Sequence, residues 1–428
     1  MAIIQFIILS ILAGLLPYSV YAAPALHEES PSWFPNNDDV LASWNSTLED
    51  RSGNLGKREV FNKCNNGFSD LMATALQDAN DIMLNMVAHL ELAVALFNGS
   101  GELIPSKVAR ASRTFDEQNA IMSYRAFIAN SYFGAGNASN PAGYAKLVNT
   151  FNLAKTVQTQ FANYLSGTSV PWTRNGIPYL YIFCTDEDLY SATNQEGLTY
   201  TEDTGYANPQ GSIYWVSASQ VTEGNGNVWD PLRGVCDLGD GATGRFLNPT
   251  VPILTGVKAY TAGAHFGLIE EKIVFCPAYH ARWEAYDATT IQSGLHYRNM
   301  HVAIGDTPTT QQATYASTLA TGRRNIAWFQ DFVVKTLIHE ATHAVAFVTP
   351  ANTKLVDIGC TFTVNGVQQT QTTVDPGCLM GVANGTYGLD ANGNAQGHKD
   401  AEAFATYAMA VWLNNVYWYT SYRAKVRP

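Results

Sequence analysis

The stretch Trp328–Val348 constrains this chain more than any other part of it, because it contains the pattern His-Glu-x-x-His. Residues four apart on a helix share a face, so the imidazoles of His339 and His343 would project in the same direction. Glu340 follows the first histidine directly, where its carboxylate can reach a metal-bound water instead of the metal. Two histidine ligands, an acid for the water's proton and an open coordination position are the arrangement of a hydrolytic zinc site.

The apolar spacing of this stretch predicts a single helix. No Gly or Pro interrupts it before Pro350, and Asp331 suits the first turn of a helix. A competing interpretation is a buried, hydrogen-bonded histidine pair without metal, since a pattern with two free positions also arises by chance. The residues that would form the buried side of the helix are Phe329, Phe332, Val333, Leu337, Ala341 and Val345.

The composition indicates a folded protein. A chain of 428 residues can bury a large core in one or two domains. Charged residues make up 14% and hydrophobic residues 46% of the sequence, which argues against global disorder. The net charge of -11 is spread along the chain, so nucleic acid is not expected as a partner.

The first residues read as a signal peptide. Ile3–Leu16 is apolar, and Val20–Ala22 forms a small-residue cleavage pattern, which together predict a signal peptide over residues 1–23. The apolar run is too short to span a bilayer comfortably, and no later stretch is long enough. We therefore expect a secreted protein without stable membrane association.

Residues 24–58 are polar, acidic and rich in turn formers, and they end in the dibasic pair Lys57–Arg58. Such a pair just before the globular pattern is where secretory processing proteases cut. The segment is therefore expected to be a propeptide or, if it is not removed, a polar arm. Residues 59–428 would form the globular domain, which we expect to be monomeric.

The cysteines indicate an oxidising compartment. An even count in an exported chain predicts three disulfides, for which fifteen connectivities are possible. Cys360 and Cys378 are the most local pair and would staple an insertion after the His-Glu-x-x-His stretch. No Cys-x-x-Cys occurs, which argues against a thiolate zinc site. The six cysteines are Cys64, Cys184, Cys236, Cys276, Cys360 and Cys378.

Four Asn-x-Ser/Thr sequons predict glycosylation on the surface of a eukaryotic secretory protein. Asn248 is followed by Pro and is excluded. The candidate positions are Asn45, Asn98, Asn137 and Asn384.

The order of predicted elements indicates an α+β fold, with N-terminal helices, a β-rich middle, the His-Glu-x-x-His helix and a closing helix. The β-rich middle covers about residues 176–280, where β-branched and aromatic runs alternate with Gly, Asn and Asp turns. Helical spacing is predicted over residues 68–97, 116–132, 145–165, 325–348 and 399–415.

Several segments in the same order resemble the deuterolysin-type zinc metalloendopeptidases, also called aspzincins or lysine-specific metalloendopeptidases, which fungi mostly secrete. The likeness is dispersed over about residues 60–415. It implies a zincin-like fold, one bound zinc ion and the hydrolysis of internal peptide bonds in proteins or peptides. The segments that carry it are Cys64 with the Ala-rich helix after it, Tyr132–Gly134, Ile273–Pro277, the stretch around His339 and His343, and Asp400–Ala408.

The third zinc ligand is where the chain departs from this family, which uses an Asp in a Gly-Thr-x-Asp-x-x-Tyr-Gly signature. Asn352 stands at the expected place here, and its neutral amide is a poor zinc ligand. Asp357 is the next candidate, on a slightly longer loop. Glu402 is the alternative third ligand, or else a group that orients a histidine. The resemblance also makes Tyr387 a candidate donor to the oxyanion of the reaction, with a packing aromatic as the alternative.

The expected activity is that of a secreted zinc metalloendopeptidase. Bound zinc would bring the pKa of a water towards about 7, and Glu340 would take its proton and pass it to the leaving amine. Two alternatives stay open: a secreted zinc-binding protein of the same fold with little or no protease activity, and a carbohydrate- or surface-binding module with a buried histidine pair. Glu340 counts against the first, since metal storage does not need a carboxylate there.

Overall fold

The chain divides into two units, residues 1–44 and 45–428. Several sequence predictions fall outside the described residues. They concern the signal peptide, the propeptide, most of the β-rich stretch, Cys236, Asn45 and Asn137. The computed structural model describes residues 61–62, 64, 66–129, 139–166, 173–174, 177–178, 180–184, 258–262, 271–348, 354–364, 367–419 and 422–427.

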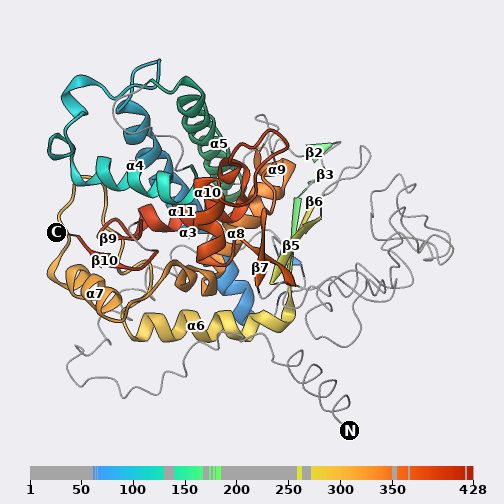
Figure 1. Cartoon of the computed structure of the whole chain (residues 1–428). Helices are drawn as coiled ribbons and strands as arrows, with labels where there is room; N and C mark the ends of the chain where they lie inside the picture. Colours follow the sequence, from blue (N-terminus) through green and yellow to red (C-terminus); the bar gives the residue numbers. More distant parts are fainter. Residues whose placement is uncertain are drawn as a thin grey trace, which may run out of the picture. The chain divides into compact units, whose positions relative to one another are not determined.

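A long central helix, α3 (Asn66–Ala95), packs against α4 (Phe115–Phe127), α5 (Pro141–Ser166), α8 (Val333–His343) and α11 (Ala401–Trp412) (Figure 1). Its apolar residues recur at helical spacing, and every residue of α11 is buried. Each fully buried Leu or Met side chain contributes about 1.5–3 kcal/mol. The predicted N-terminal helices and the closing helix are therefore confirmed, and they form the core on which α8 rests.

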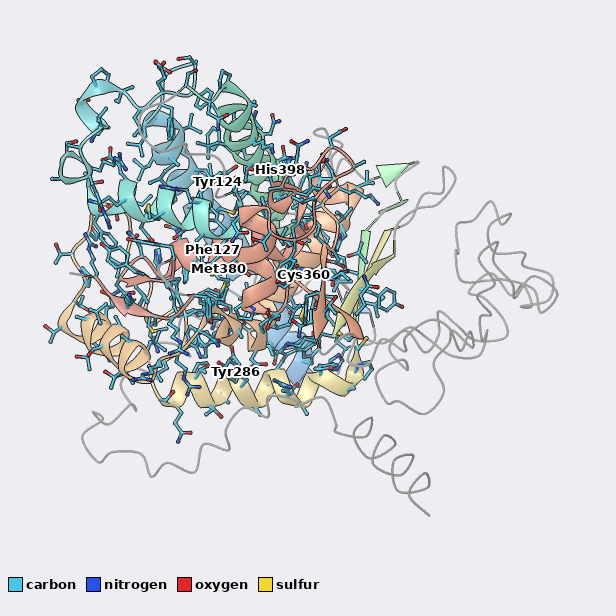
Figure 2. All side chains as sticks on the ribbon, viewed as in Figure 1. Tyr124, Phe127, Tyr286, Cys360, Met380 and His398 are labelled. Atoms are coloured by element: carbon cyan, nitrogen blue, oxygen red, sulfur yellow. A yellow bond between two sulfur atoms is a disulfide. The ribbon has the colours of Figure 1, made fainter. Side chains whose placement is uncertain are left out.

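Helix α4 is shorter than the sequence predicts. A reciprocal cap starts it, in which Thr114 accepts from the backbone N–H of Glu117 and the Glu117 side chain accepts from that of Thr114. The helix ends at Phe127, although its spacing had suggested an end near residue 132. Tyr124 and Phe127, both labelled in Figure 2, are fully buried.

The main sheet has the strand order β1-β4-β6-β5, formed by β1 (Phe61–Asn62), β4 (Leu180–Phe183), β6 (Glu271–Phe275) and β5 (Ala259–Ala262). Strands β1, β4 and β6 are parallel, and β5 runs antiparallel to β6 at the edge, with Thr261 opposite Ile273. Strand β5 lies beside α8. Helices together with a small mixed sheet make the fold α+β, as predicted.

Within the described residues, three strand pairs stand apart from the main sheet. They are β2 (Thr173–Arg174) with β3 (Ile177–Pro178), β7 (Gly359–Val364) with β8 (Val367–Thr372), and β9 (Val416–Tyr417) with β10 (Lys425–Val426), all antiparallel. The described part of the chain also contains five 3-10 helices: η1 (Pro105–Lys107), η2 (Arg110–Ser112), η8 (Pro277–Tyr279), η9 (Ile326–Asp331) and η10 (Gly397–Lys399).

Three helices were not predicted: α6 (His280–Gln292), α7 (Thr310–Thr321) and α10 (Pro376–Asn384). Two of them have local signals that could have revealed them. Thr309 and Gln312 form a reciprocal cap at the start of α7. Helix α10 has Asp375 as its N-cap and ends at Gly385, whose φ of 76° favours glycine.

The stretch Trp328–Val348 is not one helix, contrary to the prediction. Phe332 and Ala344 have extended backbones, so α8 begins at Val333 and ends at His343, and α9 (Val345–Val348) follows. Tertiary packing overrides helical spacing at the first break, because the Phe332 ring lies in an aromatic cluster, 4.9 Å from Trp328 and from Tyr297 and 5.0 Å from Tyr286 (centroid distances). Tyr286 is labelled in Figure 2. The second break turns the chain immediately after the second histidine of the motif.

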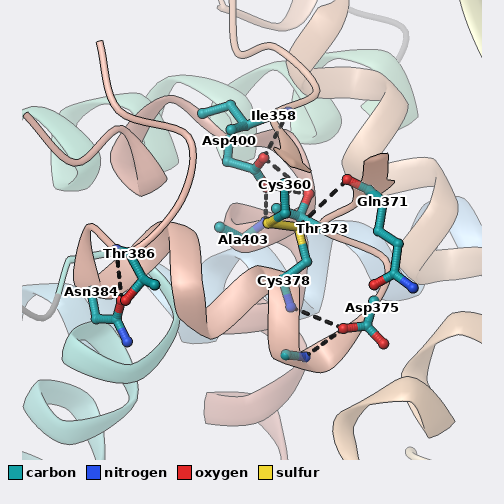
Figure 3. Close-up of a disulfide and its surroundings, with 11 residues drawn as sticks. Ile358, Cys360, Gln371, Thr373, Asp375, Cys378, Asn384, Thr386, Asp400 and Ala403 are labelled. Atoms are coloured by element: carbon teal, nitrogen blue, oxygen red, sulfur yellow. Dashed lines mark hydrogen bonds between the residues drawn. A yellow bond between two sulfur atoms is a disulfide. The ribbon is translucent and has the colours of Figure 1, made fainter. Parts of the chain in front are cut away.

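Two disulfides join described cysteines, Cys64 with Cys184 and Cys360 with Cys378. Cys276 is also disulfide-bonded, so none of the described cysteines is free. The predicted local pair is confirmed, and it joins β7 to α10 (Figure 3). These bonds indicate an oxidising, extracellular-type environment. Among the described helices, none is long and apolar enough to cross a membrane.

Replacing Cys360 and Cys378 together by Ala should lower the free energy of unfolding by about 3 kcal/mol, because the bond closes a short loop in the unfolded chain. The two residues are 18 positions apart. Urea unfolding of the double variant and the parent measures the change. An unchanged unfolding midpoint would show that this bond does not constrain the unfolded chain.

Candidate metal centre

Helix α8 presents the imidazoles of His339 and His343 on one face, and the loop before β7 brings the carboxylate of Asp357 to them. The Nε2 atoms of the two histidines are 3.2 Å apart. Oδ1 of Asp357 lies 3.1 Å from Nε2 of His339 and 3.3 Å from Nε2 of His343. These residues are the group of possible metal ligands in the part of the chain that the structure describes.

The spacing of these three atoms fits a tetrahedral zinc ion. With zinc–ligand bonds of about 2.0–2.1 Å, neighbouring ligand atoms lie about 3.3–3.4 Å apart. The three observed separations, 3.1, 3.2 and 3.3 Å, are close to that value. The Asp357 side chain is 60% exposed, against 14% for His339 and 18% for His343, so the group opens to solvent on the aspartate side. A small cation could therefore be held here with one side accessible.

His343 is oriented by the chain that returns past the end of α8. Its Nδ1 lies 2.9 Å from the carbonyl oxygen of Leu355, and the Leu355 N–H donates to the carbonyl of Thr342 at 3.0 Å. An Nδ1–H that donates to a carbonyl leaves Nε2 with its lone pair, which is the form a metal ligand needs.

His339 is oriented by a buried ion pair. Its Nδ1 lies 3.2 Å from Oε2 of Glu402, although the ring N–H is not directed squarely at that oxygen. Oε2 of Glu402 also pairs with the ammonium of Lys335, and Oε1 accepts from Gln330 at 2.6 Å. Glu402 and Lys335 are both almost fully buried. Burial opposes ionisation of Glu402, but Lys335 and His339 outweigh it and lower its pKa to about 2.

Glu402 therefore contacts Nδ1 of His339, whereas Asp357 contacts the Nε2 atoms of both histidines. Of the two candidates for the third ligand, the structure brings Asp357 to the metal-binding side of the rings. Glu402 lies where a carboxylate orients a histidine ligand and raises its basicity. Asn352 lies outside the described residues.

Asp357 is positioned by Asp400 through a hydrogen bond to the backbone of the next residue, Ile358 (Figure 3). The sequence analysis did not identify this role of Asp400. The buried Asp400 carboxylate accepts from the backbone N–H of Ile358 at 3.0 Å and from the Thr373 hydroxyl at 3.0 Å. It also caps α11 by accepting from Ala403 N–H at 2.7 Å. Burial raises the pKa of Asp400 to about 7 against these hydrogen bonds. An Asp immediately before the closing helix was the signal that could have revealed it.

Glu340 lies beside the triad and is buried. Its Oε1 is 4.0 Å from Nε2 of His339, and its Oε2 is 2.8 Å from the hydroxyl of Thr261 on β5. One carboxylate oxygen thus faces the triad while the other is held by the edge strand. Sequence reasoning placed Glu340 next to the ligands but gave no indication of Thr261.

The acidic groups around the histidine pair favour its protonated form in the metal-free protein. Burial disfavours the imidazolium of His339, but Asp357 and Glu402 outweigh burial and raise its pKa from 6.5 to about 10. The pKa of His343 is raised as well, against burial, by Asp357. A histidine with a raised folded-state pKa contributes stability that is fully present below about pH 6.5. That contribution is lost as the pH rises through about 10.

Zinc binding at pH 7.5 should consequently release about one proton or more per ion, because a histidine ligand must be neutral. Titration calorimetry in buffers of different ionisation enthalpy measures the number released. Glu402→Gln keeps the triad but removes one of the charges that raise the pKa of His339, so it should release fewer protons. Binding heats that do not depend on the buffer would contradict this expectation.

Tyr387 is placed as a packing aromatic. Its ring lies against Gly381, where an added Cβ would clash with the ring, and its centroid is 6.4 Å from that of Phe362. It belongs to the small cluster around Cys360 and Cys378. Among the described residues, no hydrogen bond joins its hydroxyl to the triad. A role as oxyanion donor stays a prediction that this geometry does not favour.

Two of the predicted glycosylation positions are described, and both are exposed. The side-chain oxygen of Asn98 accepts from the backbone and hydroxyl of Ser100, and that of Asn384 accepts in the same way from Thr386. The amide nitrogen of Asn98 donates to the carboxylate of Glu102 at 3.0 Å. Glycosylation at Asn98 and Asn384 stays a prediction that this exposure permits.

Comparison of the chain with protein-family models, with curated proteins and with solved structures finds no match. A functional assignment must therefore come from the residues themselves. The arrangement can hold a small cation between two neutral imidazoles and a carboxylate, with a second carboxylate poised to exchange a proton beside it.

Proposed function

We propose that this chain is a secreted zinc-dependent metalloendopeptidase, with one zinc ion held by His339, His343 and Asp357. The observation that carries the proposal is the convergence of these three ligand atoms beside the buried carboxylate of Glu340. Two neutral imidazoles and one carboxylate are a ligand set that suits zinc and leaves a position open for catalysis. A protein that only stored zinc would not need Glu340.

The residues of the site divide the chemistry of peptide hydrolysis among them. Zinc, when bound, supplies a Lewis acid and makes a water nucleophile available near neutral pH. Oε1 of Glu340 accepts the proton of the attacking water and later delivers it to the leaving amine. Lys335 keeps Glu402 ionised, and Glu402 holds His339 with its proton on Nδ1 and its lone pair on Nε2. Asp400 fixes the loop that carries Asp357.

Several features fit the deuterolysin-type, zincin-like fold that the sequence resembles. A His-Glu-x-x-His helix lies beside an antiparallel edge strand, the third ligand is an aspartate on the following loop, and a closing helix supplies Glu402. The aspartate stands five residues beyond the place the family would give it, as the loop is longer. Disulfides in the described chain are compatible with secretion.

Metal analysis and a protein-digestion assay of the secreted protein test the proposal. We expect one zinc per chain, loss of casein cleavage on chelation and recovery when zinc is restored. Internal cleavage sites in the products would show endopeptidase activity. One zinc without cleavage would favour the zinc-binding alternative, and a protein that binds no zinc would leave the histidine pair as a structural feature.

A further inference from the structure

We propose that Thr261 is a positioning residue for peptide hydrolysis, which holds the Glu340 carboxylate so that its free oxygen faces the attacking water. This inference rests on the proposed function, and it deepens it by assigning a role to a residue 79 positions before Glu340 in the sequence. No motif in the sequence points to Thr261.

The contact joins the edge of the sheet to the His-Glu-x-x-His helix. Thr261 lies on β5, and β5 lies beside α8. Its Oγ1 is 2.8 Å from Oε2 of Glu340 and 2.9 Å from the backbone carbonyl oxygen of the same residue. A single hydroxyl thus contacts both ends of one glutamate, the end fixed in the helix and the end that performs the chemistry.

These two contacts restrict the side chain of Glu340. The hydroxyl has one proton, and both of its neighbours can accept it, so the proton is shared between the backbone carbonyl and the carboxylate of Glu340. With Oε2 held on the strand side, Oε1 is the oxygen directed to the triad, 4.0 Å from Nε2 of His339. A proton taken up on Oε1 leaves Oε2 still able to accept from Thr261.

The strand itself does not need this hydroxyl. Strand β5 is held by backbone pairing with β6, in which Thr261 is opposite Ile273. Valine has nearly the shape of threonine and is at least as favourable in a strand. Thr261→Val therefore removes the hydroxyl with little other change, and Thr261→Ser restores it with a smaller side chain.

Kinetics of the zinc-loaded variants test the role. Thr261→Val should lower kcat by about 10–100-fold, the usual cost of losing a supporting hydrogen bond around a catalytic group, with KM and zinc content unchanged. Thr261→Ser should stay within about threefold of wild type. Thr363→Val is the matched control, because Thr363 is an exposed residue of strand β7 with no hydrogen bond to Glu340 in the described structure, and it should behave as wild type.

A crystal structure of zinc-loaded Thr261→Val gives a readout that does not depend on rate. Glu340 should adopt more than one rotamer, or turn its carboxylate from the triad, while the ligands keep their places. A single wild-type rotamer would overturn the proposal.

The outcomes separate this inference from the proposed function. If wild type cleaves and Glu340→Gln does not, but Thr261→Val matches wild type, the role of Thr261 is wrong and the peptidase assignment stands. If Thr261→Val loses zinc, or if kcat of Thr261→Ser is as low as that of Thr261→Val, Thr261 has a structural role and the inference is overturned. A wild-type protein without zinc-dependent cleavage overturns both.

Discussion

Glu340→Gln should lower the rate of peptide hydrolysis by orders of magnitude while the protein keeps its zinc. The change removes the group that takes the water's proton but none of the ligands, since Asp357 and the two histidines make the close contacts. Loss of a general base lowers the rate by about 10²–10⁴-fold. Initial rates of casein digestion, together with metal analysis of the same sample, measure the two effects separately.

His339→Ala and His343→Ala are the controls for this variant, and both should lose metal and activity together. Glutamine nearly matches glutamate in shape and keeps an oxygen that can accept from Thr261, so the fold around β5 should persist. If Glu340→Gln digested casein at the wild-type rate, Glu340 would not be the base and the proposed mechanism would be wrong.

Residues close together in the sequence were the part of the site that could be predicted. His339, Glu340 and His343 belong to one helical turn and its neighbour, so their spacing alone sets their common face. The Cys360–Cys378 bond was predictable for a similar reason, as the pair is local. The sequence also indicated the helices α3, α5 and α11, because their apolar faces are long and regular.

The remainder of the site depends on contacts between distant segments. Thr261 reaches Glu340 from a strand of a different part of the chain, and Asp400 holds the Asp357 loop across 42 residues. Lys335 is unusual, because a lysine inside the helix would be expected to point to solvent, yet it is buried against Glu402. No local pattern specifies such pairings.

The predicted helix boundaries were wrong where tertiary packing competes with the helical spacing of apolar residues. Phe332 continues the apolar period of α8, but its ring is placed in the aromatic cluster with Trp328 and Tyr297, and its backbone is extended. At Ala344 the chain leaves the helix immediately after the last histidine of the motif. This early end matters for the site, because the segment after it returns to bring Leu355 to His343.

Asp357→Ala should lower zinc affinity about as strongly as His343→Ala, by more than about 100-fold, because each removes one of three ligands. Glu402→Ala should lower it by only about 10–100-fold, since Glu402 acts through the orientation of His339. Zinc titration against a competing chelator ranks the variants. Asp306→Ala removes an exposed acid outside the triad and should leave affinity unchanged.

The free energy of unfolding without zinc gives a second comparison of Asp357 and Glu402. Asp357 is 60% exposed, so its removal should lower the free energy of unfolding of the metal-free protein by less than removal of Glu402 does, although it takes one acidic partner from the histidine pair. Glu402 is buried, and its removal leaves the Lys335 ammonium without its partner, which should cost about 3–5 kcal/mol. Urea unfolding with a chelator present measures this.

The zinc titration has one outcome that would reverse the assignment. Should Glu402→Ala lose zinc completely while Asp357→Ala retains it, the ligand role would pass to Glu402. The loop that carries Asp357 would then be a rim of the site.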